Sequence, residues 1–143
     1  MKSTGMLTVV AAAVGLLVPG VALADSVRLK AALTGAAETG GGAVGGTGNF
    51  VAQIDESSGD VCYEVTVGKV PGANMAHIHK GKAGEDGAPV VTLAVTGADG
   101  EMCMAAQPEV LAPIIAAPGD YYVNVHSAAF PKGAVRGQLE KVQ

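Results

Sequence analysis

The three histidines of the chain are the residues whose spacing points most directly to chemistry. His77 and His79 are separated by one residue, so on a β-strand both imidazoles project from the same face. His126 ends a second alternating segment, residues 121–126. If these two strands are neighbours, three neutral ring nitrogens can converge on one point, which is a geometry that copper and zinc sites use.

Met75 shares the predicted face of His77 and His79, because all three alternate along one strand. A thioether beside imidazoles favours copper. We therefore expect a copper site, or second a zinc site, with these three residues and His126 as ligands. Two other interpretations stay open, since a methionine often fills a core and histidines often form hydrogen bonds with loop carbonyls.

Other kinds of site find little support in the sequence. Ser127 follows His126 directly, which puts their side chains on opposite faces of a continuing strand, and no Gly-x-Ser-x-Gly motif occurs. The glycine-rich segment 40–48 lacks the Lys-Ser/Thr pair of a phosphate-binding loop. A net charge of -4 without a basic cluster argues against nucleic acid as a partner. We expect a binding protein rather than an enzyme.

The two cysteines, Cys62 and Cys103, are expected to form a disulfide with Cα atoms about 5.5 Å apart. This expectation depends on an oxidising compartment. A free core thiol and a metal thiolate are the alternatives.

The N-terminus predicts export. Lys2 precedes an apolar run over residues 6–18, and the small-x-small motif Ala22-Leu23-Ala24 follows. The run is shorter than the about 20 residues that span a bilayer. We expect residues 1–24 to be a signal peptide, and the mature protein to be periplasmic or secreted and not attached to the membrane.

Residues 25–143 have a length that suits one domain. Apolar and polar residues alternate with the period of a half-buried strand. The expected strands cover residues 27–33, 50–54, 61–67, 75–79, 90–96, 102–105, 121–126 and 134–141. Many short strands separated by glycine and proline turns predict an antiparallel β-sandwich or barrel.

The segment 108–117 departs from this alternation. Pro108 suits the first position of a helix, and Glu109 suits its positive end. We expect one short helical turn that ends before Pro113.

Three ordered motifs carry a resemblance to a known family: AHIHKG at 76–81, PGDYYVNVH at 118–126 and FPKGAVRGQL at 130–139. They resemble the CHRD domain, a module named from chordin and also found in single-domain exported bacterial proteins. The resemblance extends over residues 29–139 and implies a Greek-key β-sandwich, immunoglobulin-like or superoxide-dismutase-like. One departure is the Thr39-Gly40-Gly41 that follows Glu38, where the family usually has Val-Pro-Pro.

The resemblance leaves two functional alternatives beside a metal-binding protein. One is a structural or interaction module with an unidentified protein partner. The other is a single-metal enzyme similar to superoxide dismutase, which only the fold suggests. A dinuclear copper-zinc centre would need more than three histidines.

Arg136 is the basic residue inside the last strand of the resemblance, on the face opposite Val135. We expect it either to bind a carboxylate, such as that of Glu38 or Glu64, or to be a solvated arginine at a sheet edge.

The predicted cleavage is tested by N-terminal sequencing of protein recovered outside the cytoplasm. The mature chain is expected to begin at Asp25, because the small-x-small motif ends at Ala24. Recovery of a chain that retains Met1 in the membrane fraction would contradict this prediction.

Overall fold

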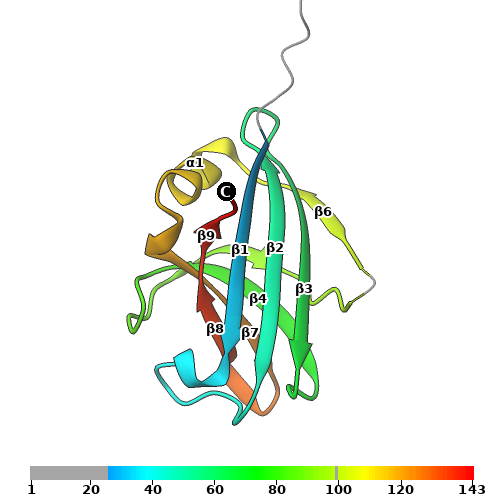
Figure 1. Cartoon of the computed structure of the whole chain (residues 1–143), viewed down its shortest axis with the longest axis vertical. Coiled ribbons are helices and arrows are strands. Elements are labelled where there is room, and N and C mark those ends of the chain that lie inside the picture. The colour runs from blue at the N-terminus through cyan, green and yellow to red at the C-terminus, as the bar shows by residue number, and fades with distance from the viewer. Residues whose placement is uncertain (1–25, 99) are drawn as a thin grey trace, which may run out of the picture.

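The computed structural model of the protein describes residues 26–98 and 100–143, and the predicted signal peptide lies outside this part. The described chain is an antiparallel β-fold with one α-helix (Figure 1). The strands are β1 (Ser26–Thr34), β2 (Thr47–Asp55), β3 (Asp60–Gly68), β4 (Ala73–Lys80), β5 (Pro89–Leu93), β6 (Met102–Ala105), β7 (Tyr121–Ser127), β8 (Phe130–Gln138) and β9 (Glu140–Lys141).

The strands form two layers, as the predicted sandwich requires (Figure 1). Their order is β5-β4-β7-β8-β1-β2-β3-β6, with every pair antiparallel and the short β9 paired with β1. The layers join at one corner, where Thr34 of β1 pairs with Arg136 of β8. The connections β3–β4, β5–β6 and β6–β7 cross between the layers, in the manner of Greek-key sandwiches. These crossings make β7 a neighbour of β4.

The core lies between the layers and consists mostly of Val, Leu, Ile and Ala side chains, together with the aromatic rings of Phe50, Tyr63 and Tyr121. In β1, for example, Leu29, Ala31 and Leu33 are buried and the residues between them are exposed. The alternation in the sequence therefore predicts the inward faces correctly. An exception is β7, which is buried almost along its whole length, because loops cover the face that points away from the core.

The helix α1 (Pro108–Ala116) is longer than the single turn expected from the sequence. Pro113 lies inside it, so the prediction that this residue ends the helix is wrong. The proline lacks an N–H and removes one backbone hydrogen bond. Burial of Leu111, Ile114 and Ile115 against the core compensates, since most helix stability in proteins comes from packing. Two 3-10 helices, η1 (Gly35–Ala37) and η2 (Pro118–Asp120), complete the described elements.

Within the described residues, no helix combines the length and the apolar character that crossing a membrane requires.

A disulfide joins Cys62 of β3 to Cys103 of β6, which confirms the predicted pair. The two residues lie directly opposite each other in the strand register. Their Cα atoms are 4.0 Å apart, closer than the expected 5.5 Å, because residues that face each other on neighbouring antiparallel strands approach closely. The bond ties the four-residue edge strand β6 to the sheet.

Replacing both cysteines by serine is expected to lower the free energy of unfolding by roughly 3 to 4 kcal/mol, the loop-closure value for a separation of 41 residues. Urea denaturation of the oxidised protein and the double variant measures the difference. Reduction of the native protein should give a similar loss. Equal denaturation midpoints for all three samples would contradict the prediction.

Candidate functional site

The pairing of β4 with β7 brings the three histidines together. In the strand register, Met75 faces His126, His77 faces Asn124, and His79 faces Tyr122. The residues between them, such as Ile78, point into the core. The histidines therefore lie on the outer face of this layer, as the spacing of the sequence predicts.

The ring nitrogens of the three histidines lie close to one another. His77 Nδ1 is 2.9 Å from His126 Nε2. The ring centroid of His77 is 4.9 Å from that of His126 and 5.5 Å from that of His79. One ligand nitrogen from each residue lies within 4.8 Å of the others. Small ring rotations would bring such a set to the about 2.0 to 2.1 Å of a metal–imidazole bond.

Two backbone carbonyls orient these rings. Nδ1 of His79 is 2.8 Å from the oxygen of Gly87, and Nδ1 of His126 is 3.1 Å from the oxygen of Pro131. A carbonyl only accepts hydrogen bonds, so both Nδ1 atoms carry the proton and both Nε2 atoms keep a lone pair. The lone pair of His126 accepts a hydrogen bond from Nδ1 of His77. That of His79 is buried and has no partner among the described residues.

Burial lowers the pKa of both His77 and His126 below the ordinary value of 6.5. For His77, positive charge on His126 and His79 would lower it further. For His126, the carbonyl of Pro131 partly opposes the effect of burial, and His79 adds to it. Both rings are therefore neutral near pH 7, which is the state in which imidazole binds a metal.

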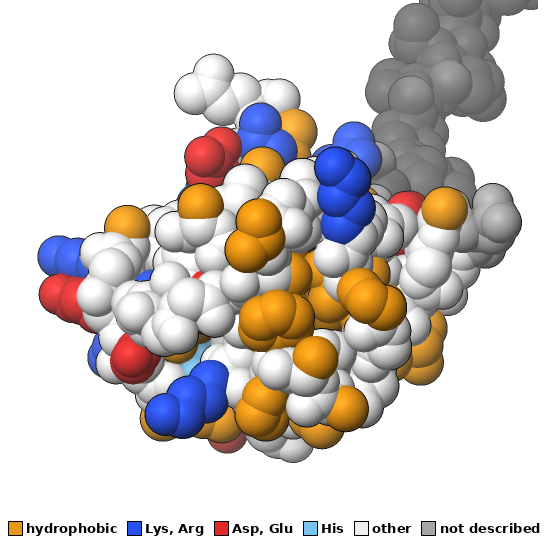
Figure 2. Space-filling model, turned by 90° about the horizontal axis from the view of Figure 1, so that it is seen from below, with side chains coloured by type: hydrophobic (Ala, Val, Ile, Leu, Met, Phe, Trp, Pro, Cys, Tyr) orange, Lys and Arg blue, Asp and Glu red, His pale blue; other side chains and the backbone are white. Residues whose placement is uncertain are grey.

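The histidine cluster opens into a cleft of about 690 Å³. Its wall includes His79 and His126 together with Glu38, Asn124 and Gly133. At this end of the molecule, Figure 2 shows a small patch of histidine surface recessed between other side chains, with apolar side chains nearby. Asn124 Oδ1 and Glu38 Oε1 are buried without a partner among the described residues, as is His79 Nε2. Polar atoms that need partners thus gather around this cleft.

Glu38 is a member of the cleft that the sequence suggests only as a partner of Arg136. Its carboxyl lies against Gly133, where a side chain would overlap it and where φ is +142°, so this position suits glycine. Burial raises the pKa of Glu38 to about 7, with the positive charge of Arg136 opposing and the negative charge of Asp86 adding to the shift. The carboxyl therefore gains or loses its proton near neutral pH.

Arg136 is only 2% exposed, which rules out a solvated arginine at a sheet edge. It does bind a carboxylate, but that of Asp86, at 3.3 Å, rather than that of Glu38 or Glu64. The sequence could not show this pairing, because it arises where the loop between β4 and β5 folds back over β8.

Met75 is 42% exposed and lies opposite His126 in the strand register. It is therefore not a core residue. Because residues directly opposite each other on paired strands share a face of the sheet, its side chain lies on the same face as His126.

The family of the protein follows from a comparison with family models. The model of the CHRD domain matches residues 29–139. The chain belongs to the CHRD domain family. The match runs from β1 to the end of β8, so the histidine cluster, the cleft and the disulfide all lie inside the CHRD domain. No curated protein matches the chain.

The raised pKa of Glu38 predicts a specific pH dependence of stability. The folded chain holds this proton up to about pH 7, whereas the carboxyl of the unfolded chain loses it near 4.5. The stabilisation is therefore complete below about pH 4.5 and is lost as the pH rises through about 7. A Glu38→Gln variant, which cannot ionise, is expected to lose this part of the dependence.

Urea denaturation of metal-free protein between pH 4.5 and 8 measures this difference. Both proteins keep the histidines, so the difference between their pH profiles isolates Glu38. Glu64→Gln, a half-buried glutamate of β3, is the control and should leave the profile unchanged. Identical profiles for the native protein and Glu38→Gln would contradict the prediction.

Proposed function

We propose that this CHRD domain binds one transition-metal ion, copper in preference to zinc, through His77, His79 and His126. The observation that carries the proposal is the convergence of one nitrogen from each ring within 4.8 Å. Metal-binding histidines commonly donate a hydrogen bond from their second ring nitrogen to a carbonyl oxygen, and two of these three histidines do so.

The hydrogen bond between His77 and His126 indicates how an ion would enter. Without metal, a proton lies between His77 Nδ1 and His126 Nε2, which are 2.9 Å apart. A metal ion would replace this proton, and His77 would then carry its proton on Nε2. Because the rings are already neutral at pH 7, binding requires a shift of tautomer and no net loss of a proton from this pair.

The choice of copper comes from the surroundings of the nitrogens. Three imidazoles would leave at least one coordination position free. The cleft borders His79 and His126, and Met75 lies opposite His126 in the strand register, so a thioether is available nearby as a further ligand. A thioether is a soft ligand that favours Cu⁺. The disulfide is in keeping with an oxidising compartment outside the cytoplasm, where we propose that the protein works.

A purely structural role for the histidines explains less. Hydrogen bonds from His79 and His126 to loop carbonyls agree with such a role. However, it gives no reason for the buried lone pair of His79 Nε2, which has no partner among the described residues. A buried polar atom without a partner costs free energy, and a metal bond would satisfy it.

The proposal is tested by metal analysis and titration of the native protein and a His126→Ala variant. We expect about one copper per native chain and at least a 100-fold weaker affinity in the variant, because two imidazoles remain. The fold should persist, since the buried Tyr121, Val123 and Val125 hold β7 in the core. Binding to the native protein should weaken when acidification protonates His77 and His126, at a pH below the ordinary histidine value of 6.5, because burial lowers the pKa of both rings.

A native protein without bound metal, or a variant with unchanged affinity, would contradict the proposal. A lower melting temperature of His126→Ala with no change in metal content would instead support the structural role.

The role of Met75 gives a separate prediction. Met75→Leu is expected to weaken Cu⁺ binding about tenfold and to leave Zn²⁺ binding unchanged, because leucine keeps the bulk but removes the soft sulfur. Met102→Leu is the matched control, since Met102 is similarly exposed, at 45% against 42%, but lies on the edge strand β6. Equal Cu⁺ affinity in both variants would exclude the thioether as a ligand.

A further inference from the structure

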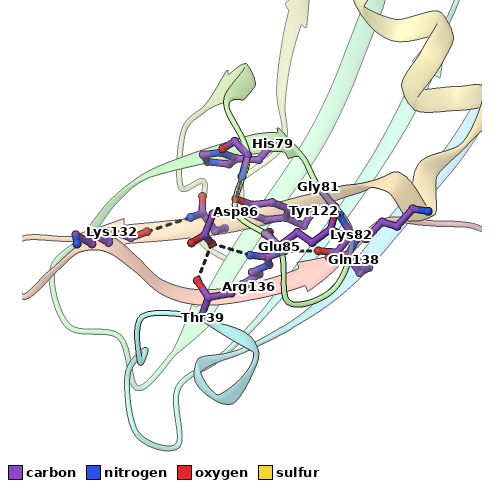
Figure 3. A network of polar contacts seen from close by, with 12 residues as sticks. Thr39, His79, Gly81, Lys82, Glu85, Asp86, Tyr122, Lys132, Arg136 and Gln138 are labelled. Carbon is purple, nitrogen blue, oxygen red and sulfur yellow. Dashed lines mark hydrogen bonds and ion pairs between the residues drawn. The ribbon is translucent and has the colours of Figure 1, made fainter.

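The loop of residues 81–88 between β4 and β5 is held by a buried arginine from β8 (Figure 3). Arg136 donates hydrogen bonds to the carbonyl oxygens of Lys82, at 2.8 Å, and Glu85, at 2.6 Å. Its guanidinium also pairs with Asp86 at 3.3 Å. One guanidinium thus binds three acceptors of the same loop. A lysine could not replace it, because the ammonium group lacks the planar arrangement of several N–H donors.

Further contacts fix the same loop at its start and middle. Gln138 donates to the carbonyl of Gly81 at 3.1 Å, and Thr39 donates to Asp86 at 2.6 Å. At Gly87 the loop approaches β4 so closely that a side chain would overlap the carbonyl of Lys80. The carbonyl of Gly87 is therefore held in place where it meets the histidine cluster.

This carbonyl is the group that orients His79, at 2.8 Å from its Nδ1. The N–H of Gly87 donates to the hydroxyl of Tyr122 at 3.3 Å. A path of contacts therefore leads from Arg136 through the loop to His79, because the segment that Arg136 binds ends at the carbonyl that accepts the hydrogen bond from His79.

A second connection runs through the ring of Tyr122. The rings of His79 and Tyr122 are stacked, with centroids 4.8 Å apart and planes 6° apart. The guanidinium carbon of Arg136 lies 3.4 Å from the centroid of Tyr122. Figure 3 shows Tyr122 between the other two side chains. A cation over an aromatic face is attracted to it, so Arg136 also holds the ring on which His79 rests.

We infer that Arg136 is a positioning residue for His79, fixing the orientation of its ring and the proton on Nδ1 through both the loop and Tyr122. The consequence for metal affinity rests on the proposed function, whereas the tautomer of His79 does not. The effect is selective, because the carbonyl that orients His126 belongs to Pro131, next to the β7–β8 turn. Loss of Arg136 should therefore disturb one histidine of the cluster and leave His126 as it is.

The test uses ¹⁵N-labelled, metal-free protein at pH 8 and long-range ¹H–¹⁵N correlation spectra, which distinguish protonated from unprotonated ring nitrogens. In the native protein, His79 and His126 should both be protonated on Nδ1. In Arg136→Met, the proton of His79 should distribute over both nitrogens while that of His126 stays on Nδ1. Titration with Cu⁺ in competition with a chromophoric chelator should show a 10- to 100-fold loss of affinity, as for other groups that orient metal ligands.

Arg28→Met, which removes the other arginine of the chain from an exposed position on β1, should change neither measurement. A folded Arg136→Met protein whose His79 keeps the single Nδ1–H tautomer would overturn the inference, as would an equal change at His126. If Arg136→Met does not fold, Arg136→Lys keeps the charge but cannot bind all three acceptors, and the same outcomes apply. A native protein that does not bind Cu⁺ would refute the proposed function, and the spectra would still decide the role of Arg136.

Discussion

The antiparallel pairing of β4 with β7 is the contact on which the rest of the site depends. It places His77 and His79 beside His126, although His79 and His126 are 47 positions apart along the chain. The pairing is fixed by the core on its other face, where Ala76 and Ile78 meet Val123 and Val125. A slip of one residue in either strand would turn the apolar side chains of that strand out of the core. The burial that stabilises the sandwich therefore also sets the geometry of the histidines.

The outer face of this layer combines groups that are costly to bury. A guanidinium, a carboxyl with a raised pKa and three imidazoles gather at this face, and all of them are at least partly buried. The guanidinium is compensated by two carbonyls and a carboxylate. The lone pair of His79 and one oxygen each of Glu38 and Asn124 have no such compensation among the described residues. This contrast separates the groups that hold the loops in place from those without a partner, which include the proposed metal ligand His79.

Much of the fold and part of the histidine cluster could be predicted from the sequence. Strict alternation identified the strands and their inward faces, and the His-x-His spacing identified one face of β4. Pro113 shows where local rules fail, because packing of Leu111, Ile114 and Ile115 outweighs the missing hydrogen bond. Arg136 and Glu38 show a second limit. The contacts of both side chains depend on how two loops fold back over the sheet, and no periodicity in the sequence predicts the path of a loop.

X-ray absorption spectroscopy of the copper-loaded protein reports the atoms bound to the metal and so shows whether the three histidines coordinate it. The expected result is a first shell that contains three imidazole nitrogens at about 2.0 Å, reduced to two in His126→Ala. A shell of oxygen ligands without imidazole scattering, or an identical spectrum for the native protein and His126→Ala, would contradict it.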